Sequence, residues 1–216
     1  MKGRILAALI FLAFQSVTAM GAIRVETFQG EEIAPYTNEI VQLCNKIYRE
    51  YPYLYNGEDA GYESYLESYS QSKEAIICLA FADEKAVGIA AGIPMSQRRN
   101  RYDQTLLEHG YDPDALFYLG EFGLKPEYQG RGIEEVMYQS IEDFARKNRN
   151  LTTICFWEIA NSLDLSQRHS GYLPKEDFWK KLGFIRHPEL NFVIFWTNIN
   201  ESQDSPHSAV YWLKEN

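Results

Sequence analysis

The chain has 216 residues, of which 45% are hydrophobic, and it carries a formal net charge of -9 at pH 7. This length and apolar content are typical of one globular domain with a substantial core. The acidic balance argues against broad nucleic-acid binding, which requires a basic face, so we expect no nucleic-acid partner.

The cysteines follow no metal-binding or redox pattern. Cys44, Cys78 and Cys155 are isolated and have apolar neighbours, which is typical of small buried hydrophobic residues. The sequence contains no CxxC pair and no HExxH motif. We therefore expect no metal site.

The N-terminus has the features of a targeting segment. A basic start at residues 1–4 precedes an apolar run over Ile5–Phe14, and Val17–Ala19 resembles a small-residue cleavage site. Residues 1–19 are thus predicted to be a signal-like hydrophobic leader, and residues 20–216 a single domain. The alternative is that translation begins at Met20, which makes residues 1–19 an upstream extension.

The first half of the domain predicts strands and helices in turn. Ile23–Phe28 has the composition of a strand, and Glu31–Arg49 has apolar residues at the spacing of an amphipathic helix. A loop rich in tyrosine leads to a short predicted helix near Tyr62–Tyr69. Two strands follow, joined in a hairpin by the polar Asp83–Lys85 connection, over Ala75–Ala82 and Ala86–Pro94.

Residues 96–114 are polar and irregular, and we expect Arg98, Arg99 and Arg101 to lie in a solvated loop. The rest of the chain predicts an aromatic strand, an amphipathic helix, a strand, a short helix and two final strands: Ala115–Leu124, Arg131–Lys147, Thr152–Ile159, Lys175–Leu182, Phe192–Thr197 and Ala209–Leu213. Gly183 is the predicted C-cap of the short helix. Strands mixed with helices predict an α/β fold with a mixed sheet.

Glycines lie between the aromatic strand and the amphipathic helix. A helix N-terminus has backbone N–H groups without internal partners and a partly positive dipole, so it binds phosphate that approaches closely. Gly130 and Gly132 have no Cβ to block that approach, and Gln129 and Arg131 add donors. These residues predict a pyrophosphate cradle, with a plain strand-to-helix turn as the alternative. The spacing fits neither a Walker loop nor a dinucleotide-binding GxGxxG loop.

The wider segment Tyr118–Ile133, YLGEFGLKPEYQGRGI, resembles the acetyl-CoA-binding motif of the GNAT superfamily of N-acetyltransferases. Gln129, Gly132 and the strand end at Leu124 match that motif. Phe178–Phe184, FWKKLGF, is similar to a late helix-to-strand segment of the same family. The order of predicted elements also resembles the family's fold, so the resemblance covers nearly the whole chain after the leader.

The resemblance implies a mixed, mostly antiparallel sheet of about six to seven strands, flanked by helices, with a splayed central pair of parallel strands. Acetyl-CoA is the implied co-substrate, with its pantetheine arm in the gap between the splayed strands. The backbone of Phe122, Gly123 and Leu124 would hydrogen-bond the arm like an added strand. The cradle would hold the pyrophosphate through Gln129, Gly130, Arg131, Gly132 and Ile133.

The implied reaction is direct attack of an amine on the thioester, which needs a base for the amine and an acid for the thiolate. Glu121 on the splayed strand is the candidate base, with a structural carboxylate as the alternative. The family's usual general-acid tyrosine falls at Trp179, whose indole N–H cannot serve as that acid. Tyr172 and Tyr118 are the candidate substitutes, with packed aromatic residues as the alternative.

Glu134 departs from the family's pattern, which prefers glycine or alanine at this position. Its carboxylate suits a bare helix N-terminus but repels a bound pyrophosphate. We therefore expect Glu134 either to point away along the helix or to pair with a cation such as Arg131.

The implied function is N-acetyl transfer from acetyl-CoA to an amine, with an acyl-CoA-binding module of little or no catalysis as the alternative. A group of tyrosines falls where the family builds its acceptor pocket and suits a small-molecule or peptide amine: Tyr51, Tyr53, Tyr55, Tyr62, Tyr65 and Tyr69. Homodimer formation is left open. Because acetyl-CoA is a cytosolic metabolite, we expect a cytoplasmic protein, whereas the leader favours export or membrane anchoring.

Overall fold

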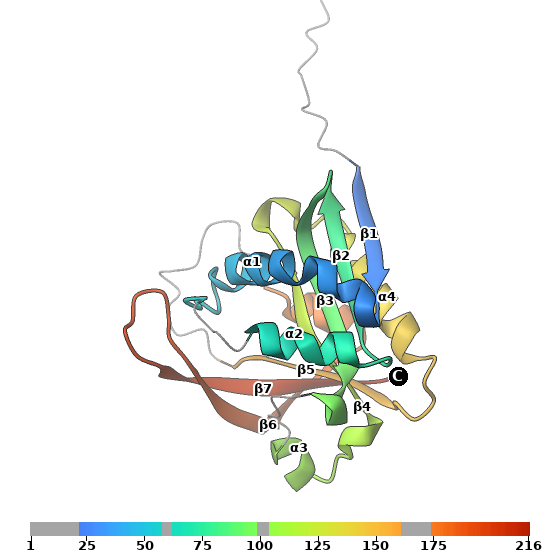
Figure 1. The fold of residues 1–216 in the computed structure, drawn as a ribbon. Coiled ribbons are helices and arrows are strands. Elements are labelled where there is room, and N and C mark those ends of the chain that lie inside the picture. The colour runs from blue at the N-terminus through green and yellow to red at the C-terminus, as the bar shows by residue number, and fades with distance from the viewer. Residues whose placement is uncertain (1–21, 58–61, 99–103, 161–173) are drawn as a thin grey trace, which may run out of the picture.

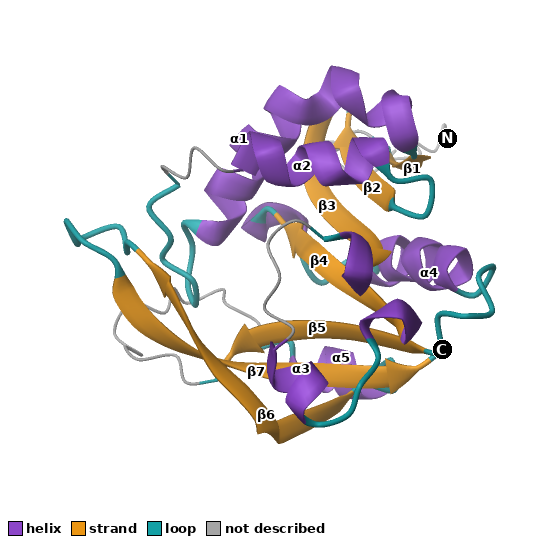
Figure 2. Cartoon of the chain, turned by 60° about the horizontal axis from the view of Figure 1, so that its bottom comes forward, coloured by secondary structure: helices purple, strands orange, loops and turns teal. Residues whose placement is uncertain are grey.

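The computed structural model describes residues 22–57, 62–98, 104–160 and 174–216. These residues form a seven-stranded sheet in the order β1-β2-β3-β4-β5-β7-β6. Helices α1 and α2 cover one face of the sheet, and α4 covers the other (Figures 1 and 2). Only β4 and β5 pair in parallel among the strands described, so the predicted mixed, mostly antiparallel sheet is confirmed.

The first half of the sheet is an antiparallel series of strands. Its strands are β1 (Ile23–Phe28), β2 (Ile76–Ala82), β3 (Lys85–Pro94) and β4 (Leu116–Leu124). The two covering helices, α1 (Thr37–Tyr48) and α2 (Tyr62–Gln71), lie between β1 and β2 in the chain. The short helix α3 (Gln104–Glu108) precedes β4.

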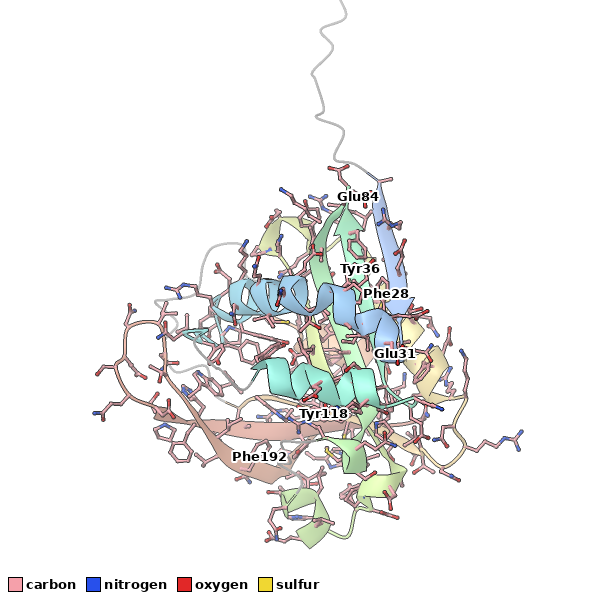
Figure 3. The ribbon with its side chains drawn as sticks, viewed as in Figure 1. Phe28, Glu31, Tyr36, Glu84, Tyr118 and Phe192 are labelled. Atoms are coloured by element: carbon pink, nitrogen blue, oxygen red, sulfur yellow. The ribbon has the colours of Figure 1, made fainter. Side chains whose placement is uncertain are left out.

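The first helix is shorter than predicted. Gly30–Tyr36 forms a 3-10 helix, and the α-helix begins only at Thr37. Pro35 explains the difference, because proline lacks an N–H and disfavours α-helical backbone in the residue before it. The ring of Tyr36 packs 4.5 Å from that of Phe28 and ties this turn to β1 (Figure 3).

Two apolar layers hold the sheet between its helices. The layer under α1 and α2 includes Ile40, Leu66 and Tyr118, and Phe192 of β6 packs against the same layer (Figure 3). The layer under α4 (Ile133–Ala145) includes Met137, Ile141 and Trp212. Cys44, Cys78 and Cys155 are free and buried in these layers, as predicted.

The central parallel strands separate after a short pairing. β5 (Thr153–Ile159) pairs with β4 over three residues of each strand, where Thr153–Cys155 lies beside Leu116–Tyr118. Beyond Tyr118 the two strands have no backbone pairing, although both continue. The predicted splay is therefore present, and it opens the middle of the sheet.

β4 also contains a bulge at Gly120. Ala91 of β3 is paired with Glu121, but the next residue, Gly92, is paired with Leu119. Gly120 is therefore the extra residue on β4. Because side chains alternate along a strand, one extra residue moves those after it to the other face.

The last strands form a long hairpin at one edge of the sheet. α5 (Glu176–Lys181) ends before Gly183, whose φ of +92° fits the predicted C-cap. β6 spans Ile185–Trp196 and pairs with β7, which spans Ser205–Glu215. β6 begins earlier than the predicted strand, because exposed polar residues of this edge strand interrupt its apolar pattern. Among the described helices, none is both long and apolar enough to cross a lipid bilayer.

Candidate active site

A cleft of about 500 Å³ lies where β4 and β5 separate, and we call it the β4–β5 cleft. Its walls come from β4, β5, the end of α1 and the start of α5, and they include Ile47, Phe122, Leu124, Phe156, Lys175 and Trp179. The predicted coenzyme contacts Phe122, Gly123 and Leu124 all line this cleft, as does Gln129. The predicted coenzyme contacts therefore lie where β4 and β5 separate.

The glycine loop joins this cleft to the N-terminus of α4. Gly130 and Gly132 have φ angles of +70° and +80°, with Arg131 at negative φ between them. Only glycine adopts such angles without strain, and backbone of alternating hand directs successive N–H groups to one side. A Cβ at Gly132 would meet no atom within 4 Å, so the space beside this residue is open. Ile133 is buried and anchors the helix start.

The two side chains predicted to be donors at this loop bind protein carbonyl groups. Gln129 Nε2 donates to the Leu124 carbonyl oxygen at 2.9 Å. Arg131 Nη2 donates to the Glu127 carbonyl oxygen at 2.6 Å, and its guanidinium lies 5.7 Å from the Tyr128 ring. Both side chains therefore hold the shape of the loop.

The negative charge of Glu134 acts on the ammonium group of Lys175. Its Nζ atom lies in the β4–β5 cleft, 5.0 Å from the centre of the Phe122 ring. Burial lowers the pKa of Lys175, and the negative charge of Glu134 partly opposes that shift. Arg131, the cation named from the sequence as an example of a partner for Glu134, donates to the loop backbone.

A second cavity, of about 210 Å³, lies on the α1–α2 side of β4, and we call it the aromatic pocket. Tyr48, Tyr53, Gly120 and Trp157 line both this pocket and the β4–β5 cleft. The two cavities thus meet across one position of β4, at Gly120. A ligand in the cleft and one in the pocket could approach each other there.

Glu121 lies in the aromatic pocket and is 6% exposed. Burial raises the pKa of its carboxyl group to about 7, and nearby tyrosine hydroxyls and the Arg98 guanidinium limit the rise. A carboxyl group with a pKa near neutral pH can exchange protons efficiently under physiological conditions. The candidate base predicted from the sequence is therefore in a cavity with a suitable pKa.

Two tyrosines explain the glycine at the bulge. The hydroxyl groups of Tyr65 and Tyr69 hydrogen-bond each other at 2.7 Å. A Cβ at Gly120 would lie 2.3 Å from the Tyr65 hydroxyl and 2.4 Å from the Tyr69 hydroxyl. No larger residue fits there without moving this pair. Tyr65 lines the aromatic pocket, whereas Tyr69 is fully buried behind it.

Arg98 is buried, which corrects the expectation of a solvated loop. It is 7% exposed and lines the aromatic pocket, where its guanidinium lies 4.0 Å from the centre of the Tyr118 ring. The sequence pattern misled because polar neighbours usually indicate exposure. Arg99 and Arg101 lie outside the described residues.

Tyr48 links the two cavities. The Phe122 backbone N–H donates to the Tyr48 hydroxyl at 3.3 Å, and the negative charge of Glu121 acts on the same hydroxyl. Burial raises the pKa of Tyr48 well above its ordinary value, so its proton is retained at neutral pH. Sequence reasoning missed Tyr48, although its position four residues after buried Cys44 places it on the inner face of α1.

Trp179, Tyr118 and Tyr172 are the other residues considered from the sequence for the role of the acid. Trp179 is buried among aromatic rings, with its ring centre 4.3 Å from that of Phe156 and 4.8 Å from that of Phe122. Tyr118 lines the aromatic pocket, and burial raises its pKa. Tyr172 lies outside the described residues. No group of three or more His, Cys, Asp or Glu side chains in the described part could hold a metal ion.

Comparisons with known proteins agree with this architecture. The profile of the Acetyltransferase (GNAT) family matches residues 40–184. No curated protein sequence matches the chain. Arabidopsis thaliana NAA60, solved with a bisubstrate analogue, superposes with a TM-score of 0.57 at 10% identity, covering 89% of this chain and 99% of that one.

Two bacterial structures superpose in the same way. An acetyltransferase from Streptococcus agalactiae gives a TM-score of 0.55 at 16% identity, covering 90% of this chain and 98% of that one. The ribosomal-protein-S18-alanine N-acetyltransferase from Escherichia coli gives 0.53 at 7% identity, covering 90% and 94%. At these identities the likeness shows the fold alone.

Proposed function

Because the chain belongs to the GNAT acetyltransferase family, we propose that it transfers an acetyl group from acetyl-CoA to the amine of a small molecule or peptide. The observation that carries this proposal is the meeting of the β4–β5 cleft and the aromatic pocket at Gly120, with Glu121 beside it. One cavity would hold the donor, and the other would hold the acceptor.

The residues of the cleft suit acetyl-CoA. Bound acetyl-CoA would supply an activated acetyl group, and the products are the acetylated amine and the free thiol of coenzyme A. From Phe122 to Leu124, the edge of β4 that faces β5 is not paired with that strand and would bind the pantetheine arm, because separated strands leave backbone groups for an added strand. The N–H groups at Gly130, Arg131, Gly132 and Ile133 would bind the pyrophosphate, with Gln129 and Arg131 shaping the loop.

Glu121 would act as the general base. An amine attacks only in its neutral form, so a proton must leave the acceptor. The carboxylate lies in the aromatic pocket, and its pKa of about 7 balances proton affinity against the fraction that is ionised. Tyr48, which lines the same pocket and whose hydroxyl is affected by the charge of Glu121, would help to orient the carboxylate.

Tyr48 would return a proton to the leaving thiolate. The charge of Glu121 acts on its hydroxyl, and its side chain also lines the cleft where the thioester would lie. A proton accepted by Glu121 would replace the one that Tyr48 gives up, which would offset the high pKa of the tyrosine. Tyr118 lines the acceptor side only and is the second candidate. Tyr172 stays a third candidate from the sequence.

The first test measures coenzyme A release and protein stability together. Purified protein is mixed with acetyl-CoA and a panel of amines, and free thiol is followed over time. Stabilisation by coenzyme A is measured by thermal unfolding, because a ligand of the folded state must stabilise it. We expect stabilisation and turnover with at least one amine. No stabilisation by coenzyme A or acetyl-CoA would contradict the proposal.

A binding module is the alternative, and buried Trp179 is the observation that favours it. This side chain occupies the place of the family's usual acid but is packed among rings and cannot give up a proton at neutral pH. The module would bind coenzyme A tightly and release no thiol with any amine. The same two measurements distinguish it from an enzyme.

We also propose that residues 20–216 act as one domain in the cytoplasm, where acetyl-CoA is available. The signal-like segment over residues 1–19 lies outside the described residues. N-terminal sequencing of the native protein tests both points, since cleavage near Ala19 would favour export. Light scattering of the purified protein tests the open question of a homodimer.

A further inference from the structure

The aromatic pocket is small and has flat walls. Its volume of about 210 Å³ is below the range of about 300–1,000 Å³ common for ligand sites. Aromatic side chains from α1, α2, β5, β6 and the loop after α1 face it: Tyr48, Tyr53, Tyr62, Trp157, Phe195 and Trp196. Such walls favour a compact acceptor with a planar apolar body, because rings stack on rings and exclude water.

The charges of the described pocket residues suit one amine. Among these residues, Glu121 is the one carboxylate and Arg98 the one cation. An acceptor with several ammonium groups would place further positive charge near the Arg98 guanidinium. Burying a charge beside a like charge is unfavourable, so a polyamine is disfavoured.

The backbone of the turn after β6, beside the pocket, is already paired. Tyr55 of the loop after α1 forms an antiparallel bridge with Asn198 in the turn after β6. Asn56 N–H donates to the Thr197 carbonyl oxygen at 3.0 Å, and Ile199 N–H donates to the Leu54 carbonyl oxygen at 2.8 Å.

The Trp196 indole N–H also donates to the Tyr53 carbonyl oxygen, at 3.2 Å, so a pocket-lining side chain joins the same contact. An extended peptide binds most readily by adding to free backbone groups at an edge. In this protein the loop after α1 already pairs with the backbone of residues 197–199. The contact therefore disfavours an extended polypeptide acceptor at this edge.

From the size, the charges and this contact, we infer that the acceptor is a compact monoamine with an aromatic body, of the arylalkylamine type. The ring would lie between the aromatic walls, and the amine would lie beside Glu121 near Gly120. This inference rests on the proposed acetyl transfer and names its substrate class. The amine would gain the acetyl group and lose one proton to Glu121, and coenzyme A would leave as its thiol.

The test compares three probes with the full chain and acetyl-CoA: 2-phenylethylamine, spermidine and a tetrapeptide with a free N-terminus. We expect kcat/KM for 2-phenylethylamine to exceed that of the other two by at least about tenfold. A higher value for spermidine or the tetrapeptide would overturn the inference while leaving acetyl transfer intact. Absence of coenzyme A binding and of turnover with all probes would instead count against the proposed function.

Two surface variants of β6 test the location of the ring. Phe195 lines the pocket and is 62% exposed, so Phe195→Ala should leave folding intact. We expect it to raise KM for 2-phenylethylamine about tenfold without changing KM for acetyl-CoA. Val193→Ala is the matched control, because Val193 is 55% exposed on the same strand and is not among the residues that line the pocket. Equal effects of the two variants would overturn the assignment.

Discussion

Tyr118 and Glu121 are three residues apart in β4, yet both line the aromatic pocket. In a regular strand they would face opposite sides of the sheet, because side chains alternate. The bulge at Gly120 brings them to one side. A single extra residue thus places the Glu121 carboxylate in the aromatic pocket. It leaves Phe122 facing Trp179 in the apolar layer under α4.

The pH dependence of turnover follows from Glu121. Because burial raises the pKa of its carboxyl group to about 7, activity should rise as pH increases through about 7. Glu121→Gln should lower kcat by about 10²–10³-fold and remove this limb of the profile of kcat against pH. A variant that keeps the limb would show that another group is the base.

The same carboxyl group should affect stability. Its folded-state pKa of about 7 is above the ordinary 4.5, so the folded state binds more protons between these values. The stabilising contribution of Glu121 is complete below about pH 4.5 and is lost as pH rises through about 7. Glu121→Gln should therefore gain stability relative to wild type from pH 5 to pH 8, by on the order of 1–3 kcal/mol. Exposed Glu31→Gln is the control in these denaturant titrations and should show no such trend.

Removal of the Tyr48 hydroxyl tests the proton path. Tyr48→Phe keeps the ring that packs 5.0 Å from Tyr53 but loses the hydroxyl that accepts from the Phe122 N–H and is affected by the charge of Glu121. We expect kcat to fall about 10²-fold, with KM for acetyl-CoA changed by no more than about twofold. The control Tyr36→Phe removes the hydroxyl group from a ring near β1, and this ring is not among those that line either cavity. An unchanged kcat in Tyr48→Phe would transfer the acid role to another residue.

Gly132 and Gly110 have similar backbone conformations, so a comparison of substitutions at the two positions distinguishes backbone strain from an effect on ligand binding. Gly132 and Gly110 have φ angles of +80° and +83°, and a Cβ at either would meet no atom within 4 Å. Alanine at each should therefore cost about 1 kcal/mol of stability. Only Gly132→Ala should weaken coenzyme A binding, by about tenfold, because its new methyl group would project where the pyrophosphate approaches. Isothermal titration calorimetry gives the comparison, and equal affinities would argue against the cradle.

The charge of Glu134 should oppose coenzyme binding. Its carboxylate acts on Lys175 in the cleft, so Glu134→Gln should tighten coenzyme A binding and Lys175→Met should weaken it, each by about three- to tenfold at low salt. Both effects should shrink as ionic strength rises. Glu135→Gln is the control, since the Glu135 carboxylate lies 3.9 Å from exposed Lys181. No difference between Glu134→Gln and Glu135→Gln would mean that Glu134 points away from the phosphates.

Local patterns predicted most of the fold. β1 has the predicted bounds, because Ile23–Phe28 is a short segment with a clear strand composition. The splay and the position of Glu121 on the splayed strand were also expected, from the resemblance to the family, and the glycine loop was expected from its residues. The bulge at Gly120 has no local signal, because it arises from pairing with β3 and from the tyrosines above it.

The charges around the site were harder to predict than its backbone. Arg98 is buried because aromatic rings of α2 and β4 lie next to it in space, not in sequence. The charge of Glu134 acts on Lys175, which precedes α5, because α5 packs beside α4 in space, whereas the sequence offered the neighbouring Arg131 as an example of a partner. Long-range packing decides both cases.

The tyrosine pair above Gly120 also constrains how this protein can evolve. Any side chain at position 120 would meet the hydroxyl groups of Tyr65 and Tyr69, so the three positions cannot change independently. A side chain at position 120 would require the two tyrosines to move or to be replaced, and Tyr65 lines the aromatic pocket. A change at this one backbone position is therefore coupled to a change in the shape of the pocket.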